Sequence, residues 1–170
     1  IGVGNMGGGH LETMLGHGEV QVVAVSDVDA VKLRAACERT ETHYAAERAA
    51  GTFKGCTGYN EFERLLARAD IDAVIIAVPD HWHATIAIAA ARAGKDIYCE
   101  KPLALTVREA REMVNAARRH ARVFQTGSQQ RSSPEFRKAC ELVRNGRLGK
   151  LQSIHVNIGP PSRDKYFEPQ

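Results

Sequence analysis

Ile-Gly-Val-Gly-Asn-Met-Gly, residues 1–7, carries three glycines in the spacing G-x-G-x-x-G, directly after an apolar strand end and before a helical pattern. Gly2 suits a tight turn, Gly4 lets the backbone approach a pyrophosphate, and Gly7 lets a helix pack closely on a sheet. The amide groups that open the helix are then free to bind an anion. A flexible turn of chance composition is the alternative, because two more glycines follow directly.

An acidic residue at the end of the next strand supports the first interpretation. Asp27 stands twenty positions after Gly7. A carboxylate there can accept hydrogen bonds from the hydroxyls of an adenosine ribose, and it repels a 2′-phosphate. The pattern therefore favours NAD over NADP. Alternatively Asp27 is only a turn residue, and Lys32 and Arg34 are the nearest cations that could accommodate NADP.

Short β-branched runs alternate with amphipathic stretches along the chain, which is typical of βαβ units in a parallel sheet. The run Ala-Val-Ile-Ile-Ala-Val is apolar without alternation, as expected for a central strand covered on both faces. We therefore predict an α/β fold with a doubly wound parallel sheet. Its expected strands are residues 1–4, 20–26, a weak one at 53–57, 73–78, 96–99 and 123–126.

The pattern changes near the end of the chain. We expect an NAD-binding Rossmann domain over residues 1–127, with its first strand truncated, and the incomplete start of a second α/β domain over 128–170. Residues 151–158 alternate imperfectly between apolar and polar side chains, which favours a half-exposed antiparallel strand. The polar, Ala-rich residues 40–55 are expected to form an excursion on the surface.

Composition excludes several classes of protein. The formal charge of +3 is spread along the chain, so no basic patch for nucleic acid is expected. No apolar stretch approaches the roughly 20 residues that cross a bilayer. The four cysteines form no C-x-x-C pair, which excludes a zinc ribbon and a thiol redox motif and favours the cytoplasm. Export by a twin-arginine leader stays open, because such a leader would precede Ile1.

Two polar segments follow the fourth and fifth expected strands, where open α/β sheets bind ligands. The first is Pro-Asp-His-Trp-His, residues 79–83, and the second is Glu-Lys-Pro, residues 100–102. A partly desolvated lysine in such a crevice has a lowered pKa and can donate a proton to a carbonyl oxygen. Lys101 is our candidate for that role, against the alternative of a solvated turn lysine.

The aromatic residues of the first segment are less specific. His81 and His83 are compatible with ordinary hydrogen-bonded residues at a helix start, and without a third ligand we predict no metal site. Trp82 is compatible with a core anchor and with a wall of the nicotinamide pocket.

Taken together, these segments resemble the glucose-fructose oxidoreductase, inositol dehydrogenase and rhizopine-catabolism family (Gfo/Idh/MocA). The resemblance covers essentially the whole chain and rests on the glycine turn, Asp27 and three segments: A-V-P-D-H-W-H, A-G-K-D-I-Y-C-E-K-P and T-G-S-Q-Q-R-S-S-P. It implies a Rossmann domain followed by an α/β domain whose large, mostly antiparallel sheet closes over the nicotinamide. It also implies a homo-oligomer assembled through that sheet.

The resemblance assigns roles to single residues. Lys101 matches the lysine that contacts both the nicotinamide ribose and the substrate hydroxyl, Glu100 faces the cofactor, and His83, predicted as catalytic with Lys101, matches a histidine that follows a Pro-Asn pair. Asp80 stands where Asn is common, a departure from the family pattern that changes the local charge. The expected cofactor contacts are Gly2, Gly4, Asn5, Met6, Gly7, Asp27, Ala77, Pro79, Trp82, His83, Glu100, Lys101 and Gln129, and the expected substrate contacts are Lys101 and Arg131.

We therefore predict an NAD-dependent oxidoreductase that transfers a hydride to or from a secondary alcohol of a sugar, inositol or related polyol. The family's second-domain His or Asp lies beyond Gln170, so this chain alone is expected to be inactive. An NAD-dependent glycosidase that oxidises its sugar transiently is one alternative. A catalytically silent NAD-binding module is another.

Overall fold

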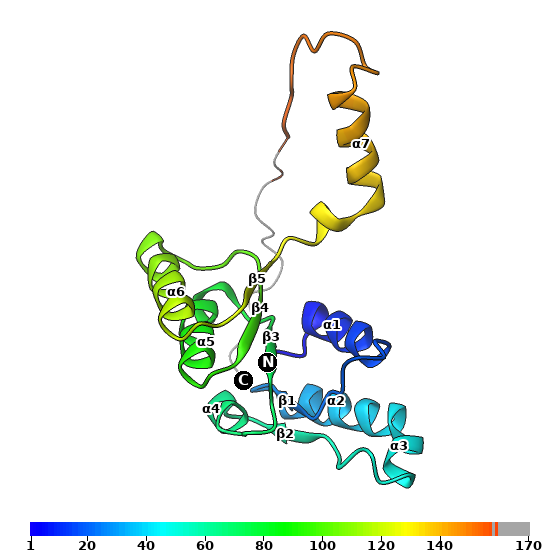
Figure 1. Cartoon of the computed structure of the whole chain (residues 1–170), viewed down its shortest axis with the longest axis vertical. Helices are drawn as coiled ribbons and strands as arrows, with labels where there is room; N and C mark the ends of the chain where they lie inside the picture. The colour runs from blue at the N-terminus through cyan, green and yellow to red at the C-terminus, as the bar shows by residue number, and fades with distance from the viewer. Residues whose placement is uncertain (158, 160–170) are drawn as a thin grey trace. The chain divides into compact units, whose positions relative to one another are not determined.

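The computed structural model describes residues 1–157 and 159, and contacts divide the chain into two units, residues 1–128 and 129–170. The first unit alternates helices and strands along the chain (Figure 1). Its elements are α1 (Asn5–Leu15), β1 (Ala24–Ser26), α2 (Ala30–His43), α3 (Ala45–Ala49), β2 (Thr57–Tyr59), α4 (Phe62–Leu66), β3 (Ala73–Ile76), α5 (Asp80–Arg92), β4 (Asp96–Glu100), α6 (Val107–Arg119) and β5 (Phe124–Gly127).

All strand pairs of the first unit are parallel. β1 pairs with β2, and β4 lies between β3 and β5. The first residues of the chain join the two groups: the Ile1 amine donates to the Ile75 carbonyl at 2.8 Å, the Ala77 amide to the Ile1 carbonyl at 2.9 Å, and the Gly2 amide to the Ser26 carbonyl at 2.8 Å. The order is therefore β2, β1, residues 1–2, β3, β4, β5, which is the order of a dinucleotide-binding sheet.

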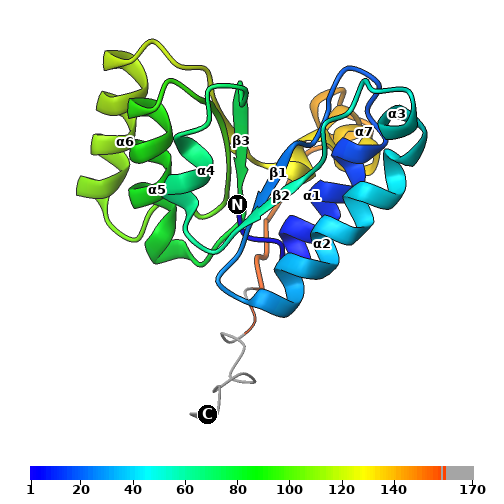
Figure 2. The same cartoon turned by 90° about the horizontal axis from the view of Figure 1, so that it is seen from below.

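Helices cover both faces of this sheet, so the predicted doubly wound Rossmann architecture is confirmed. Figure 2 shows α1, α2 and α3 on one side of the strands and α4, α5 and α6 on the other. Each side has its own buried cluster, one built around Ile76, Ala87 and Ile97 and the other around Leu11, Val25 and Leu33. Burial of these apolar side chains, at about 25 cal/mol per Å² of surface, is the main force that holds the helices against the strands.

Side chains cap the first turns of two helices. The Asp29 side chain accepts hydrogen bonds from the amides of Val31 and Lys32 at the start of α2. Thr106 and Glu109 form a reciprocal capping box at the start of α6.

Two strand positions differ from the prediction. β1 is confined to Ala24–Ser26, and the weak strand expected at residues 53–57 forms later, at Thr57–Tyr59. Phe53 is instead buried against the ring of Tyr44, with centroids 4.7 Å apart. The segment between α2 and β2 is therefore anchored to the core by these two aromatic rings and carries the short helix α3, whereas the sequence predicted only a surface excursion.

The second unit begins with a 3-10 helix, η1 (Gln129–Ser132), followed by α7 (Pro134–Arg144). The strand predicted over residues 151–158 is wrong for residues 151–157, which have no regular secondary structure; residue 158 lies outside the described residues. A strand needs backbone partners, and the described part of this unit holds no second strand with which it could pair. Across residues 1–157 and 159, no helix has the length and apolar character needed to cross a membrane.

Candidate functional site

The glycine turn brings the start of α1 very close to the neighbouring backbone. Gly2 has φ +79°, and a Cβ there would lie 2.4 Å from the carbonyl oxygen of Ala77. A Cβ on Gly7 would lie 1.8 Å from the carbonyl oxygen of Gly2. Only glycine fits at either position, so the helix packs directly on the first residues of the chain. Around Gly4, by contrast, a Cβ would meet nothing within 4 Å.

The open space at Gly4 faces the amino end of α1. Gly4 precedes the helix in an extended conformation and has no side chain that could cap the first amides, which are those of Asn5, Met6 and Gly7. A hollow of about 420 Å³ lies beside this turn and is lined by Val3, Gly4, Asn5, Gly8, Gly9, Glu12, Lys32 and Arg39. Unpaired amides together with the positive end of a helix dipole suit an anion. The turn therefore fits the pyrophosphate of a dinucleotide.

Asp27 follows β1 and joins this strand to the glycine turn. One carboxylate oxygen, Oδ2, accepts a hydrogen bond from the Val3 amide at 2.8 Å, and Oδ1 accepts one from the Asp29 amide at 2.9 Å. Each oxygen of a carboxylate can accept a second bond. Asp27 is therefore fixed in place by the backbone and retains acceptor capacity for a ribose hydroxyl.

The Glu-Lys-Pro segment lies at the carboxyl end of β4, on the edge of the sheet where the glycine turn also lies. Glu100 is buried, with 3% of the residue exposed, while Lys101 is exposed. The Glu100 carboxylate contacts the Nε2 atom of His10 at 2.7 Å and accepts a hydrogen bond from the Lys101 amide at 3.1 Å. Within the described residues nothing covers Lys101, so the desolvation expected from the sequence is not provided by the first unit alone.

His83 is held beneath the same segment. It is 1% exposed, and its Nδ1 atom lies 2.6 Å from the carbonyl oxygen of Pro102, so the ring donates its Nδ1 proton there. Its Nε2 atom has no hydrogen-bond partner among the described residues. This geometry favours a role in holding the Glu-Lys-Pro segment; the catalytic role inferred from the sequence stays a prediction.

The other predicted contacts are distributed over both units. Ala77 and Pro79 follow β3 and lie at the carboxyl edge of the sheet, next to the glycine turn through the contact of Ala77 with Gly2. Trp82 is 45% exposed, with its ring 6.4 Å from that of Phe62, so it is no buried core anchor. Two of the predicted contacts, Gln129 and Arg131, belong to η1 of the second unit and are exposed.

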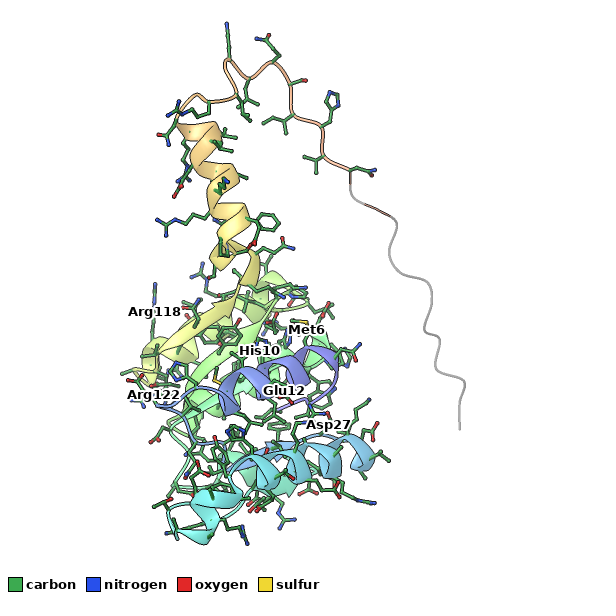
Figure 3. The ribbon with its side chains drawn as sticks, turned by 90° about the vertical axis from the view of Figure 1, so that its right-hand side faces the viewer. Met6, His10, Glu12, Asp27, Arg118 and Arg122 are labelled. Carbon is green, nitrogen blue, oxygen red and sulfur yellow. The ribbon has the colours of Figure 1, made fainter. Side chains whose placement is uncertain are left out.

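Sequence reasoning missed His10, which lies on α1 (Figure 3). Its signal was its position three residues after Gly7, on the side of the helix that packs against the sheet, but the partner Glu100 lies 90 residues away. No cluster of three or more His, Cys, Asp or Glu able to hold a metal ion occurs in the part of the chain that the structure describes.

A larger cavity, of about 720 Å³, lies along the amino-terminal side of the sheet. Its mostly apolar walls come largely from residues 19–25, 70–75 and 96–98, and residues 1–3 with Gly7, His10, Leu11 and Met14 also line it. Parallel α/β sheets bind ligands at the carboxyl ends of their strands, where Gly4, Asp27 and Lys101 lie. The candidate site is therefore the carboxyl edge and not this cavity.

Comparisons with known proteins identify the family of the chain. Residues 1–128 match the model of an oxidoreductase family described as having an NAD-binding Rossmann fold (GFO_IDH_MocA). Inositol 2-dehydrogenase 2 of Saccharopolyspora erythraea is 32% identical over 166 residues, which cover 95% of this chain and 45% of that protein. An inositol 2-dehydrogenase of Rhizobium meliloti is 30% identical over 162 residues, which cover 95% of this chain and 44% of that protein. The chain thus spans less than half the length of these curated relatives.

Solved structures show the same likeness. The myo-inositol 2-dehydrogenase of Lactobacillus plantarum superposes with a TM-score of 0.70 at 29% identity, covering 88% of this chain and 41% of that one. A scyllo-inositol dehydrogenase of Lactobacillus casei, solved with bound NAD(H) and scyllo-inositol, gives a TM-score of 0.71 at 25% identity, covering 87% and 40%.

Proposed function

Because the chain belongs to the oxidoreductase family with an NAD-binding Rossmann fold that residues 1–128 match, we propose that the complete protein is an NAD-dependent dehydrogenase of polyols. It would transfer a hydride between NAD and a secondary alcohol of a sugar, inositol or related compound. The observation that carries the proposal is the placement of an exposed Lys101 at the end of β4, on the same sheet edge as the glycine turn and Asp27.

Each part of this edge has a task in the proposed reaction. The first amides of α1 would hold the pyrophosphate, and Asp27 would hold the adenosine ribose. NAD, when bound, supplies the hydride acceptor. Lys101 would exchange a proton with the substrate hydroxyl, and Glu100 would face the cofactor. His83 would keep the Lys101 segment in place through the Pro102 carbonyl.

Gln129 is proposed to contact the cofactor and Arg131 the substrate, because the resemblance to the family implies these roles. A polyol is the proposed substrate because relatives of this chain are named inositol dehydrogenases and because one solved relative holds scyllo-inositol. The homo-oligomer and the cytoplasmic location expected from the sequence stay predictions.

The test is turnover by the complete protein with NAD and myo-inositol, scyllo-inositol or glucose, followed by NADH absorbance. Lys101→Ala should lower kcat by about 10²- to 10⁴-fold, the usual contribution of a general acid or base. The matched control is Lys54→Ala, which removes an exposed lysine before β2 and should leave turnover unchanged. Wild-type turnover by Lys101→Ala would refute the assigned role.

Two other outcomes would replace the proposal. Release of the aglycone from a glycoside without net formation of NADH would identify an NAD-dependent glycosidase. Tight NAD binding without turnover of any polyol or glycoside would identify a silent cofactor-binding module.

A further inference from the structure

Among the ion pairs of the described residues, the contact between His10 and Glu100 has the least exposed side chains. The Nε2 atom of His10 lies 2.7 Å from Oε1 of Glu100, and the two side chains are 20% and 5% exposed. Each of the other ion pairs has at least one partner whose side chain is more than 40% exposed. Exposed pairs contribute little to the stability of a particular geometry, whereas a buried carboxylate requires defined partners.

The surroundings of Glu100 are shaped for its carboxylate. A Cβ on Gly127, the last residue of β5, would lie 2.8 Å from Oε1, so any larger residue there would crowd the carboxylate. The ring of Tyr98 packs edge-on to His10 at a centroid distance of 5.2 Å. Burial raises the pKa of Tyr98, and the negative charge of Glu100 raises it further. Glu100 therefore sits in a pocket built by α1, β4 and β5.

The two oxygens of Glu100 have different partners. Oε1 accepts a hydrogen bond from the His10 ring, since an ionised carboxylate can only accept. Oε2 accepts one from the backbone amide of Lys101. The hydrogen bond from His10 on α1 therefore orients the carboxylate through Oε1. The hydrogen bond to Oε2 in turn fixes the backbone of Lys101.

We propose that His10 is a positioning residue for Lys101 and acts through the Glu100 carboxylate. The same helix would bind the pyrophosphate at its first turn and align the lysine through its second turn. This inference rests on the proposed role of Lys101 in proton transfer.

The test compares three variants of the complete protein. His10→Leu removes the donor. His10→Gln retains an amide donor at about the position of Nε2. His17→Leu makes the same change at an exposed histidine outside α1 and is the matched control. For each variant we would measure kcat and KM with NAD and myo-inositol, Kd for NAD, the unfolding temperature, and amide hydrogen exchange in peptides covering residues 98–105.

The expected pattern separates positioning from simple stabilisation. His10→Leu should lower kcat by about 10- to 100-fold, the loss expected from a misplaced reactive group, with Kd for NAD changed less than about 3-fold. Exchange should accelerate in residues 98–105 and not in α6. His10→Gln should restore both readouts to within about 3-fold of wild type, and His17→Leu should match wild type.

Several results would overturn the inference. One is a kcat for His10→Leu within twofold of wild type, whatever its unfolding temperature. Another is faster exchange throughout the unit with no rescue by His10→Gln, which would mean that His10 only stabilises the fold. If wild type turns over no polyol while the local exchange pattern holds, the proposed function fails, and the structural link from His10 through Glu100 to the Lys101 backbone stands.

Discussion

The carboxylate of Asp27 accepts a hydrogen bond from the Val3 amide at 2.8 Å, across 24 residues of sequence. This bond ties the end of β1 to the centre of the glycine turn. The other carboxylate oxygen of Asp27 accepts a hydrogen bond from the Asp29 amide at 2.9 Å. Asp27 therefore has two tasks, to hold the turn and to present a negative charge to the ribose, and both need two carboxylate oxygens.

Asp27→Asn should weaken NAD binding because an amide has one acceptor oxygen where the structure uses two. We expect Kd for NAD to rise about tenfold, which corresponds to roughly 1.4 kcal/mol, and the ratio of NADP to NAD affinity to increase as the negative charge is lost. Calorimetric titration of the complete protein with both coenzymes measures this. Asp72→Asn is the control, since it makes the same change at an exposed carboxylate before β3. Unchanged NAD affinity in Asp27→Asn would contradict the assignment.

Gly4→Ala should separate cofactor binding from folding. The backbone at Gly4 has φ −69°, which alanine adopts, and the added methyl group would meet no protein atom within 4 Å. Stability should therefore stay at the wild-type level, while the methyl group blocks the approach of the pyrophosphate and NAD affinity falls at least about tenfold. Gly18→Ala, also in open space, should change neither quantity. A Gly4→Ala protein that binds NAD normally would show that the pyrophosphate lies elsewhere.

Most of the first unit could be predicted from sequence because its strands are short apolar runs bounded by helix caps. β3 forms where a continuous apolar run predicts it, and β4 forms where the short run at residues 96–99 predicts it. β2 forms later than predicted because Phe53, a good strand former, packs in the core against Tyr44. The strand expected at 151–158 rested on local alternation alone, and a local pattern cannot supply the partner strand.

The site was predictable where residues adjacent in sequence share one task. Gly2, Gly4 and Gly7 lie in one turn, so their spacing is informative. The contact between His10 and Glu100 joins residues 90 positions apart, and no local pattern indicates it. The burial of His83 was also hidden, because a histidine at the start of a helix is usually exposed.

Variants of His83 can show whether this residue only holds the Glu-Lys-Pro segment in place or also transfers protons. His83→Leu replaces the ring with a side chain of similar volume. It removes the hydrogen bond to the Pro102 carbonyl, and it also removes the buried, unpaired Nε2 atom. Because these two effects oppose each other, the unfolding temperature should change little. If His83 only holds the segment, kcat should fall about tenfold in His83→Leu and recover in His83→Asn, whose amide can donate to the same carbonyl. If His83 transfers protons, His83→Asn should be as impaired as His83→Leu. Steady-state kinetics of the complete protein distinguishes the two.

The cysteines should differ strongly in reactivity with pH. Burial raises the pKa of Cys56 and of Cys99 to about 12, whereas Cys140 is exposed. Because the thiolate is the reactive form, about 1 in 10,000 molecules would be reactive at Cys56 or Cys99 at pH 8, rising tenfold per pH unit. Iodoacetamide at pH 8, with peptide mass mapping, should modify Cys140 first; in urea all four should react. Equal labelling of Cys99 and Cys140 in the folded protein would be inconsistent with this burial.

Gly127→Ala should destabilise the protein by displacing Glu100. The new methyl group would lie 2.8 Å from Oε1 and 2.9 Å from Cδ of Glu100, and 3.0 Å from its Cα. Overpacking of this kind costs about 1–3 kcal/mol.

If the cost arises from the carboxylate, Gly127→Ala should cost less in a Glu100→Ala background, where only the contact with Cα remains. Urea unfolding of the two single variants and the double variant gives the coupling energy, expected at about 0.5 kcal/mol or more for groups in contact. Equal costs in both backgrounds would mean that the backbone, and not the Glu100 carboxylate, requires glycine at the end of β5.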